Sequence, residues 1–306
     1  MIELREGNAS DREAILSLRT CCFPDDDREK QDPRFWDWEF SRGRVFLAMD
    51  GERAVAHLGF SPQTLMIDGG PVSSMLAVDA MTDPDYRRQG LFQRVAALAA
   101  ARLRESVQLS TAWQIRDAVL PPMTANGWKP LLRASVLVKP VSLRSTPLPM
   151  ECGGSAAALE EGGAAAVEFL RNVNHGSRDA AFLRWRFTSN RLWPYAIDAN
   201  ADAYVVTRRT TLRGYDTLAI ADLGWRPGQS REGRLLLRDA IARGRAAGVQ
   251  LTAVLMSLGH PALPTLVRSG FLPSPHRFRF LVNVFDERVK LNRAKWGLTW
   301  GDTDHL

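Results

Sequence analysis

The sequence predicts an α/β chain of 306 residues that is made of two similar domains in tandem. Short apolar runs with strand composition alternate with longer amphipathic runs, which is the pattern of mixed strands and helices. Motifs of the first half also recur in the second half with the same spacing. Between the halves lies a stretch rich in Pro, Ser, Gly and Ala with little periodicity, which is typical of a connection between domains.

The internal repeat combines an aromatic signature with a fixed interval between glycines. The signature Phe35-x-x-Trp38-x-Phe40 recurs after another aspartate as Phe182-x-x-Trp185-x-Phe187. In each half two glycines are 37 residues apart, and these pairs are Gly90 with Gly127 and Gly233 with Gly270. Two unrelated domains would not be expected to share both features, so we predict two tandem domains of one fold.

The elements of the first domain follow from local signals. Ser10 and Glu13 form a capping box for a first helix. Asp-Gly, Ser-Pro and Gly-Gly-Pro turns separate strands that we expect to form an antiparallel meander. The expected strands are 2–6, 45–49, 54–60, 63–67, 75–81, 108–114 and 133–138, and the expected helices are 10–19, 33–40, 91–104 and 120–126.

The predicted domain bounds follow the change in composition. The first domain spans residues 1–140, a linker 141–162, the second domain 163–285 and a C-terminal tail 286–306. The tail carries Trp296 and Trp300 among charged residues. It is expected to be a helix docked on either domain or on a second subunit.

The stretch from residue 75 to residue 104 carries the clearest functional signal. A strand, Met75–Met81, is followed by a loop with Arg87, Arg88 and Gly90 and then by a helix that starts near Leu91. A helix start presents unpaired backbone N–H groups and the positive end of the helix dipole. With two arginines beside it, this loop is suited to bind a phosphate or pyrophosphate group.

These residues resemble motif A of the GCN5-related N-acetyltransferases, whose pattern is Gln/Arg-x-x-Gly-x-Gly/Ala. Arg87-x-x-Gly90 matches the pattern and follows Asp83-Pro84-Asp85-Tyr86, whereas Phe92 stands where the family prefers Gly or Ala. The resemblance implies two domains of this fold, each a mixed, mostly antiparallel sheet flanked by helices. It also implies acetyl-CoA or another acyl-CoA as cosubstrate. The residues expected to bind it are Ala80, Met81, Thr82, Arg87, Arg88, Gln89, Gly90, Leu91 and Phe92.

The two halves differ at the loop that would hold the cosubstrate. The second half has Ser230-Arg231-Glu232-Gly233-Arg234, so that Glu232 would repel a pyrophosphate. Trp225, at the end of the preceding strand, would crowd the path of the pantetheine arm. We therefore predict that the first half binds the acyl donor and that the second half is degenerate. Arg231 and Arg234 leave the opposite assignment open.

The catalytic residues are less clearly indicated. In the family the base is often a carboxylate on the strand before the loop, and Asp79 is the acidic residue in that position. A buried or edge carboxylate held by a hydrogen bond is the alternative role for Asp79. The tyrosine that commonly serves as acid is replaced by Met123, and the usual asparagine is replaced by Arg116. These departures leave open a non-catalytic acyl-CoA sensor or assembly protein.

The remaining expectations come from composition. The net charge of +6 fits a polyanionic partner, but the arginines are scattered and accompany no nucleic-acid motif, so coenzyme A fits better than nucleic acid. Three cysteines form neither a disulfide framework nor a metal set, and no apolar run could span a membrane. We expect a cytoplasmic N-acyltransferase without a metal that acts on a primary amine, of a small molecule rather than a protein. Homo-oligomerisation is left open.

Overall fold

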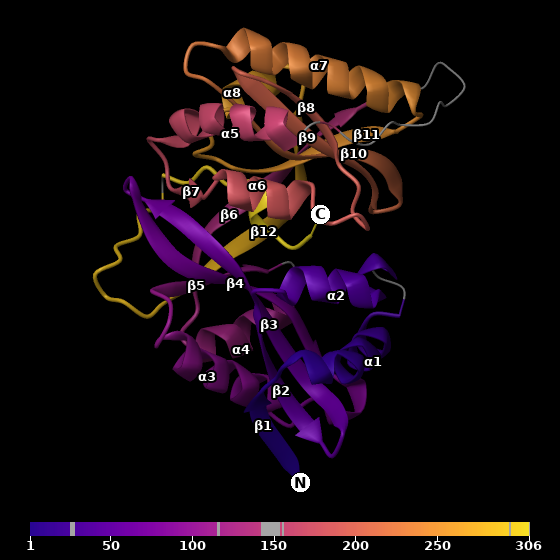
Figure 1. Cartoon of the computed structure of the whole chain (residues 1–306), viewed down its shortest axis with the longest axis vertical. Helices are drawn as coiled ribbons and strands as arrows, with labels where there is room; N and C mark the ends of the chain where they lie inside the picture. Colours follow the sequence, from indigo (N-terminus) through magenta and orange to yellow (C-terminus); the bar gives the residue numbers. More distant parts are fainter. Residues whose placement is uncertain (25–27, 115–116, 142–153, 155, 294, 306) are drawn as a thin grey trace. The chain divides into compact units, whose positions relative to one another are not determined.

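The structure is a computed structural model of the whole chain (Figure 1), and it describes residues 1–24, 28–114, 117–141, 154, 156–293 and 295–305. The chain forms two compact units. Unit 1 comprises residues 1–64, 72–131 and 279–291, and unit 2 comprises residues 65–71, 132–278 and 292–306. Asp25 to Asp27, Arg116 and Cys152 lie outside the described residues.

Unit 1 contains a sheet with the strand order β1-β2-β3-β4-β5-β12. Strands β4 and β5 run parallel, and the pairs β1–β2, β2–β3 and β5–β12 are antiparallel. Helices α3 and α4 lie on one side of these strands, and α1 and α2 lie on the other (Figure 1). The bounds are β1 (Ile2–Glu6), α1 (Arg12–Cys22), α2 (Pro33–Phe40), β2 (Arg44–Asp50), β3 (Arg53–Ile67), β4 (Gly70–Thr82), α3 (Leu91–Leu103), β5 (Leu109–Gln114), α4 (Leu120–Ala125) and β12 (Leu272–Val284).

The core of unit 1 lies between the sheet and helix α3. Leu91, Val95, Ala99 and Leu103 recur at helical spacing and are all buried in the same apolar cluster as strand residues such as Phe46. This apolar stripe fixes α3 against the sheet, so that the start of the helix follows directly on the end of β4 and the loop after it. The core thus positions the loop that the sequence singles out.

Unit 2 repeats this arrangement with the strand order β6-β11-β10-β9-β8. Strands β10 and β11 run parallel, and β8–β9, β9–β10 and β6–β11 are antiparallel. The short strand β7 pairs with the end of β3. The bounds are β6 (Lys129–Pro140), α5 (Ala156–Leu170), β7 (His175–Gly176), α6 (Ala180–Phe187), β8 (Ala196–Asn200), β9 (Ala203–Leu212), β10 (Tyr215–Trp225), α7 (Ser230–Ala246), β11 (Leu251–Ser257) and α8 (Leu263–Arg268).

Each unit contains a strand from the other half of the sequence. Residues 134–140 of β6 pair with β11 in unit 2, and residues 279–284 of β12 pair with β5 in unit 1. The structural units therefore differ from the bounds 1–140 and 163–285 expected from composition. A change in composition marks where a linker lies. It does not indicate which neighbour the last strand of each half will pair with.

The segment 141–162, expected to be a linker, contains the first half of helix α5, which starts at Ala156. Gly162 and Gly163, which lie in the middle of this helix, contributed to the expectation of a loop. A Cβ at Gly163 would overlap the Leu183 side chain, and a Cβ at Gly162 would lie 2.9 Å from Tyr204 Cβ. The glycines allow α5 to approach α6 and β9 closely, so here they are packing residues of a helix rather than residues of a turn.

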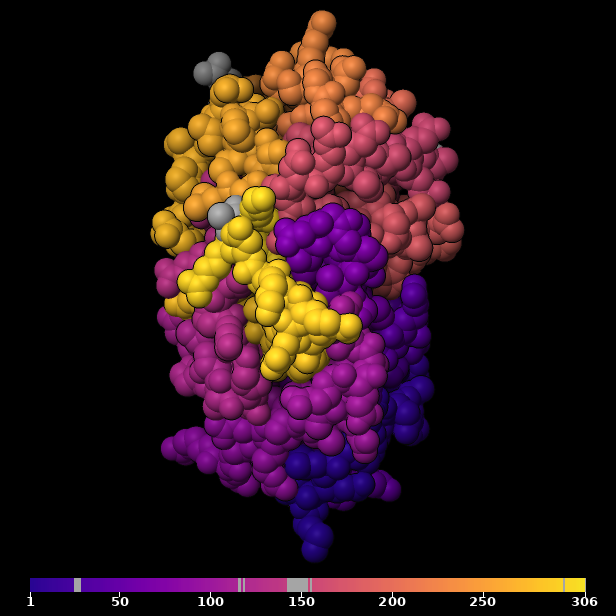
Figure 2. Space-filling view, turned by 90° about the vertical axis from the view of Figure 1, so that its left-hand side faces the viewer, coloured from indigo at the N-terminus to yellow at the C-terminus, as the bar shows by residue number. Residues whose placement is uncertain are grey.

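The residues of the tail 286–306 that the structure describes do not form a docked helix. Residues 286–291 belong to unit 1, and yellow atoms from the C-terminal part of the chain lie at the surface in Figure 2. Residues 292–306 belong to unit 2, where Trp296 and Trp300 are buried and the described helical structure is a single 3-10 turn, Trp300–Asp302.

Two local expectations also differ from the structure. Residues 54–60 and 63–67 belong to one strand, β3, which continues through Ser61 and Pro62. The capping box forms two residues earlier than expected, between Asn8 and Asp11, because Asp11 is also held by Arg5 at 2.6 Å. The expected Ser-Pro turn is therefore wrong, and the expected capping box is displaced by two residues.

Among the helices that the structure describes, none is both long and apolar enough to cross a membrane. The described residues likewise contain no cluster of three or more His, Cys, Asp or Glu side chains with the geometry to hold a metal ion.

Candidate acyl-donor site

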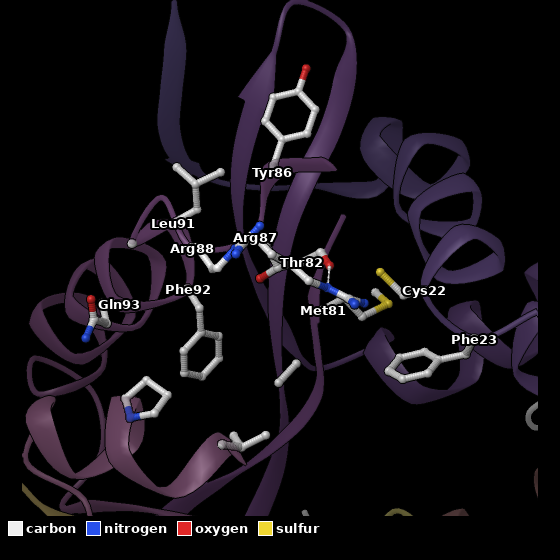
Figure 3. A pocket seen from close by; sticks show the side chains of 14 residues that line it. Cys22, Phe23, Met81, Thr82, Tyr86, Arg87, Arg88, Leu91, Phe92 and Gln93 are labelled. Atoms are coloured by element: carbon white, nitrogen blue, oxygen red, sulfur yellow. Dashed lines mark hydrogen bonds between the residues drawn. The ribbon is translucent and has the colours of Figure 1, made fainter. Parts of the chain in front are cut away.

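A pocket of about 610 Å³ opens in unit 1 where β4 ends and α3 begins (Figure 3). Eight of the nine residues predicted to bind a cosubstrate line this pocket, and Gln89 and the predicted base Asp79 do not. The lining residues are Cys22, Phe23, Ala80, Met81, Thr82, Tyr86, Arg87, Arg88, Gly90, Leu91, Phe92, Gln93, Val119 and Pro122.

The loop before α3 adopts a backbone that leaves the first amide groups of the helix without a partner in the described chain. Gly90 is the N-cap of α3 with φ +70°, and Arg88 also has a positive φ of +64°. The backbone amides of Leu91, Phe92 and Gln93 donate no hydrogen bond to any part of the chain that the structure describes. Three unpaired N–H groups and the positive end of a helix dipole therefore meet at the pocket wall, which is the requirement for binding an anion.

The turn before the loop is held by side chains from neighbouring strands. The Asp83 carboxylate accepts a hydrogen bond from the Asp85 amide at 3.0 Å and forms an ion pair with Arg53. The Tyr86 hydroxyl donates to Asp50 at 2.8 Å. These contacts fix the backbone on one side of the loop, while α3 fixes it on the other side.

Two arginines supply positive charge at the pocket. Arg87 and Arg88 are both exposed. Figure 3 shows Arg87 turned toward Cys22 and Met81, and its Nε donates to the Thr82 carbonyl at 3.2 Å. An arginine beside free helix amides adds positive charge and bidentate hydrogen bonds to an anion-binding site.

Asp79 lies next to the pocket-lining residue Ala80, but it is engaged in ion pairs. Its carboxylate is 2.5 Å from Arg19 Nη1 and 3.7 Å from Lys30 Nζ. Burial alone would raise the pKa of Asp79, but the charges of Arg19 and Lys30 outweigh it and hold the pKa below its ordinary value. A carboxylate so stabilised is a weak base. The base role of Asp79 stays a prediction, and this geometry matches the alternative role of a held carboxylate.

The backbone at Asp79 is also unusual. Its φ is +49°, and its carbonyl oxygen lies 2.7 Å from Nδ1 of the fully buried His57, which must donate to it. Burial lowers the pKa of His57, which keeps the imidazole neutral. The positive φ is a local departure from extended backbone within β4, directly before the pocket-lining residues Ala80 and Met81.

Several pocket residues were not predicted because they come from distant elements. Cys22 and Phe23 end helix α1, and Val119 and Pro122 belong to the segment around α4. Burial raises the pKa of the Cys22 thiol, so it is protonated near neutral pH. No motif connects these residues with the loop in the sequence. Met123, at the position where the family has its acid, is buried in the core of unit 1.

In unit 2 the corresponding position is filled by an indole ring. Trp225 is 3% exposed and packs so closely on Gly233 that a Cβ there would overlap the ring. The ring of Phe169 packs against the same indole, with 4.5 Å between ring centroids. Glu232 stands in the first turn of α7. The start of α7 is therefore covered by an apolar side chain and carries a negative charge, both of which oppose phosphate binding.

Solved structures of similar fold cover nearly the whole chain. A GCN5-related N-acetyltransferase from Kribbella flavida has a TM-score of 0.66 at 14% identity, with 94% of this chain and 72% of that chain covered. A GCN5-related N-acetyltransferase from Anabaena variabilis has a TM-score of 0.65 at 11% identity, with 93% and 73% covered. A conserved protein of unknown function from Enterococcus faecalis, described as a probable N-acyltransferase, has a TM-score of 0.65 at 15% identity, with 94% and 73% covered.

The chain therefore has the fold of the GCN5-related N-acetyltransferases, and the predicted fold class is confirmed. The sequence of residues 3–116 matches the family described as acetyltransferase (GNAT) domain. The matched range begins within β1 and contains β2 to β5 and the whole loop before α3. Residues 3–116 are thus similar in sequence to the acetyltransferase (GNAT) domain family, and acyl transfer is the general activity of that family. A search of curated protein sequences finds no match.

Proposed function

We propose that unit 1 binds acetyl-CoA or another acyl-CoA and transfers its acyl group to a primary amine, most simply that of a small molecule. The proposal rests on the anion-binding site at the start of α3, which we name the donor seat. It consists of the amides of Leu91, Phe92 and Gln93, unpaired in the described chain, and of Arg87 and Arg88, at the wall of a pocket of about 610 Å³. A pyrophosphate in this seat would satisfy amides that otherwise lack a partner in the described chain.

The rest of the pocket suits the arm of the donor. Ala80, Met81 and Thr82 end strand β4 on one side, and Phe92, Val119 and Pro122 offer apolar surface on another. An extended amide-containing arm can pair with a strand edge and lie on apolar side chains. Phe92 supplies apolar surface there, whereas Gly90 supplies the backbone conformation that the loop needs.

The proposed chemistry is direct attack on the thioester. The nitrogen lone pair of a neutral amine attacks the carbonyl carbon, the C–N bond forms, and the C–S bond breaks with its electron pair leaving on sulfur. A backbone N–H at Met81, beside the kink at Asp79, is the proposed donor to the carbonyl oxygen during this step. The proton of the amine leaves to water, because the pKa of Asp79 is held low by Arg19 and Lys30. The thiolate leaves without a tyrosine acid.

A second candidate function is supported by the same residues. The ion-paired Asp79 and the buried Met123 both lack the acid–base properties that acyl transfer usually employs. A protein that binds acyl-CoA without turnover, as a sensor or assembly partner, needs the donor seat but neither of those groups. Turnover in the presence of amines distinguishes the two functions, whereas donor binding alone does not.

The donor seat is tested by calorimetric titration of acetyl-CoA into the wild type and into Gly90→Val. A β-branched residue at φ +70° is strained by about 1–2 kcal/mol or more, and the loop relaxes by moving its amides. We expect the dissociation constant to rise at least about tenfold, since 1.4 kcal/mol corresponds to a factor of ten.

Gly51→Val is the matched control for this prediction. Gly51 also has a positive φ, +59°, and a Cβ added there would meet open space, but it lies in the turn between β2 and β3 and does not line the pocket. The control should lose comparable stability and keep the affinity for acetyl-CoA. Equal affinity for acetyl-CoA in Gly90→Val and Gly51→Val would contradict the proposed seat.

The identity of the acyl group and of the amine, the cytoplasmic location, the lack of nucleic-acid binding and the oligomeric state stay predictions from the sequence. The proposed donor site is built from residues of unit 1 alone.

A further inference from the structure

Strands β10 and β11 of unit 2 stop pairing at the position that corresponds to the point where β4 and β5 of unit 1 stop pairing. The parallel pairs run over Ser74–Ala77 with Leu109–Ala112 in unit 1, and over Thr217–Ile220 with Leu251–Val254 in unit 2. Beyond these pairs each strand continues without a further pair to its neighbour among the described residues. Asp79 and Asp222 each lie five residues after the first paired residue, so they occupy equivalent positions.

The opening between β4 and β5 in unit 1 adjoins the pocket, because Ala80 to Thr82 line it. The opening in unit 2 is filled by residues 295–305, which we name the C-terminal strap. On the side of β11, the Ser257 amide donates to the Leu298 carbonyl at 3.1 Å, and Met256 forms a bridge with Thr299. On the side of β10, the Thr299 hydroxyl donates to the Asp222 carboxylate at 2.9 Å. The strap thus lies between the two separated strands.

A buried arginine fixes the strap to unit 2. Arg178 donates through Nε to Asp222 at 2.6 Å, and through Nη1 and Nη2 to the two carboxylate oxygens of Asp302 at 2.8 and 2.9 Å. Arg186 donates to the Thr303 carbonyl at 3.0 Å. Arg178 and Arg186 thus bind a specific side chain and the backbone of the strap, as the residues of a peptide-binding site do.

The strap also carries two large apolar anchors. Trp296 and Trp300 are 1% and 2% exposed, whereas residues 285–293 between β12 and the strap are exposed or half-buried. Trp296 donates through Nε1 to the Asn292 carbonyl at 2.7 Å, and its carbonyl accepts from Ser257 Oγ at 2.5 Å. A short segment with two buried tryptophans and one fully paired carboxylate is bound mainly by a few anchor residues.

From these contacts we infer that the opening between β10 and β11 is a peptide-binding groove, occupied in cis by the C-terminal strap. The strap stands where unit 1 would accept the arm of an acyl donor, and that comparison rests on the proposed function. The groove selects a segment with Trp296, Thr299, Trp300 and Asp302. Unit 2 therefore holds a peptide in place of a cosubstrate.

Hydrogen exchange of the full chain tests the occupancy of the groove. The amides of Leu298, Thr299 and Asp302 are hydrogen-bonded, at 2.9, 2.8 and 3.1 Å, and should exchange slowly without any cosubstrate present. Saturating acetyl-CoA should slow exchange near residues 80–93 and leave the strap unchanged. Rapid strap exchange in the wild type would overturn the inference, and so would loss of strap protection on adding acetyl-CoA. Absence of any acetyl-CoA effect would contradict only the proposed function.

Peptide binding in trans separates a groove from an ordinary core segment. Thr299→Val in the full chain removes the hydroxyl that bonds Asp222 and the Gly301 amide but keeps the side-chain shape, and Thr299→Ser restores that hydroxyl. The valine variant should exchange its strap at least about tenfold faster than the serine variant. A labelled peptide with the natural sequence 292–306 should bind the valine variant at least about tenfold more tightly than the wild type, because the cis occupant competes less.

The same peptide with Asp302→Asn is the control ligand, because it lacks the carboxylate that Arg178 binds. It should bind at least about tenfold more weakly than the natural peptide. If the valine variant has a faster-exchanging strap and still binds neither peptide, the strap is a core segment and the inference is wrong. If both peptides bind equally, recognition through Asp302 is wrong.

Discussion

Arg87→Ala combined with Arg88→Ala is expected to weaken binding of acetyl-CoA by at least about a hundredfold. Both side chains stand at the pocket beside the unpaired amides of α3. A hydrogen bond from a charged group is worth about 1.5–3 kcal/mol, so two of them account for a factor of this size or more. Calorimetric titration at low salt measures it, and the difference should shrink as salt is raised.

The control for this variant removes the same charge from the same helix. Arg94 and Arg102 are exposed on α3 and do not line the pocket. Arg94→Ala with Arg102→Ala should therefore change the affinity for acetyl-CoA by only a small factor. If both double variants weaken binding equally, the arginines act through the general charge of unit 1 and not through contact with the ligand.

Arg178→Met is expected to lower the free energy of unfolding by about 3–5 kcal/mol, the usual effect of removing one partner of a buried ion pair. Arg178 is fully buried and donates to Asp222 and Asp302, so its loss leaves two buried carboxylates without a counter-ion. Chemical denaturation followed by tryptophan fluorescence measures the change. Arg209→Met, which breaks an exposed ion pair with Asp216, should cost less than about 1 kcal/mol.

The effect of Arg178 should depend on pH in a defined direction. Burial raises the pKa of Asp302, but Arg178 outweighs burial and brings it below the ordinary value. A lowered folded-state pKa stabilises the protein above the unfolded pKa of about 4, and this stability is lost as the pH falls through the folded value. The wild type should therefore lose stability on acidification below about pH 4. Arg178→Met should lose less, because its Asp302 is no longer held ionised. A destabilisation by Arg178→Met that stays constant down to pH 3 would contradict this assignment.

The backbone geometry of the proposed donor seat could be predicted because its signals are local. Gly90 needs a left-handed conformation, α3 begins at the next residue, and the apolar spacing of α3 fixes it on the sheet. All of these properties depend on neighbours within a few residues. The mixed content of strands and helices followed from the alternation of apolar and amphipathic runs, and the GNAT-like fold followed from the resemblance of the loop at Arg87 to Gly90 to motif A.

Other features depend on partners far away in the sequence. Nothing near Asp79 in the sequence predicts that Arg19 and Lys30 will form ion pairs with its carboxylate, and these ion pairs decide how basic the carboxylate is. The exchange of β6 and β12 between the units is set by strand pairing across more than a hundred residues. The binding of the strap to unit 2 depends on the contact between Arg178 and Asp302, which are 124 residues apart in the sequence.

The most direct test of the proposed function is release of free coenzyme A thiol from acetyl-CoA by the wild type, measured with a panel of primary amines. We expect at least one amine to give turnover that is lost in Arg87→Ala/Arg88→Ala and kept in Arg94→Ala/Arg102→Ala. The rate should rise with pH in step with the pKa of that amine, because the neutral amine is the nucleophile. Tight acetyl-CoA binding with no turnover for any amine would contradict acyl transfer and leave the sensor function, and turnover unaffected by the loop variant would place the active site outside unit 1's pocket.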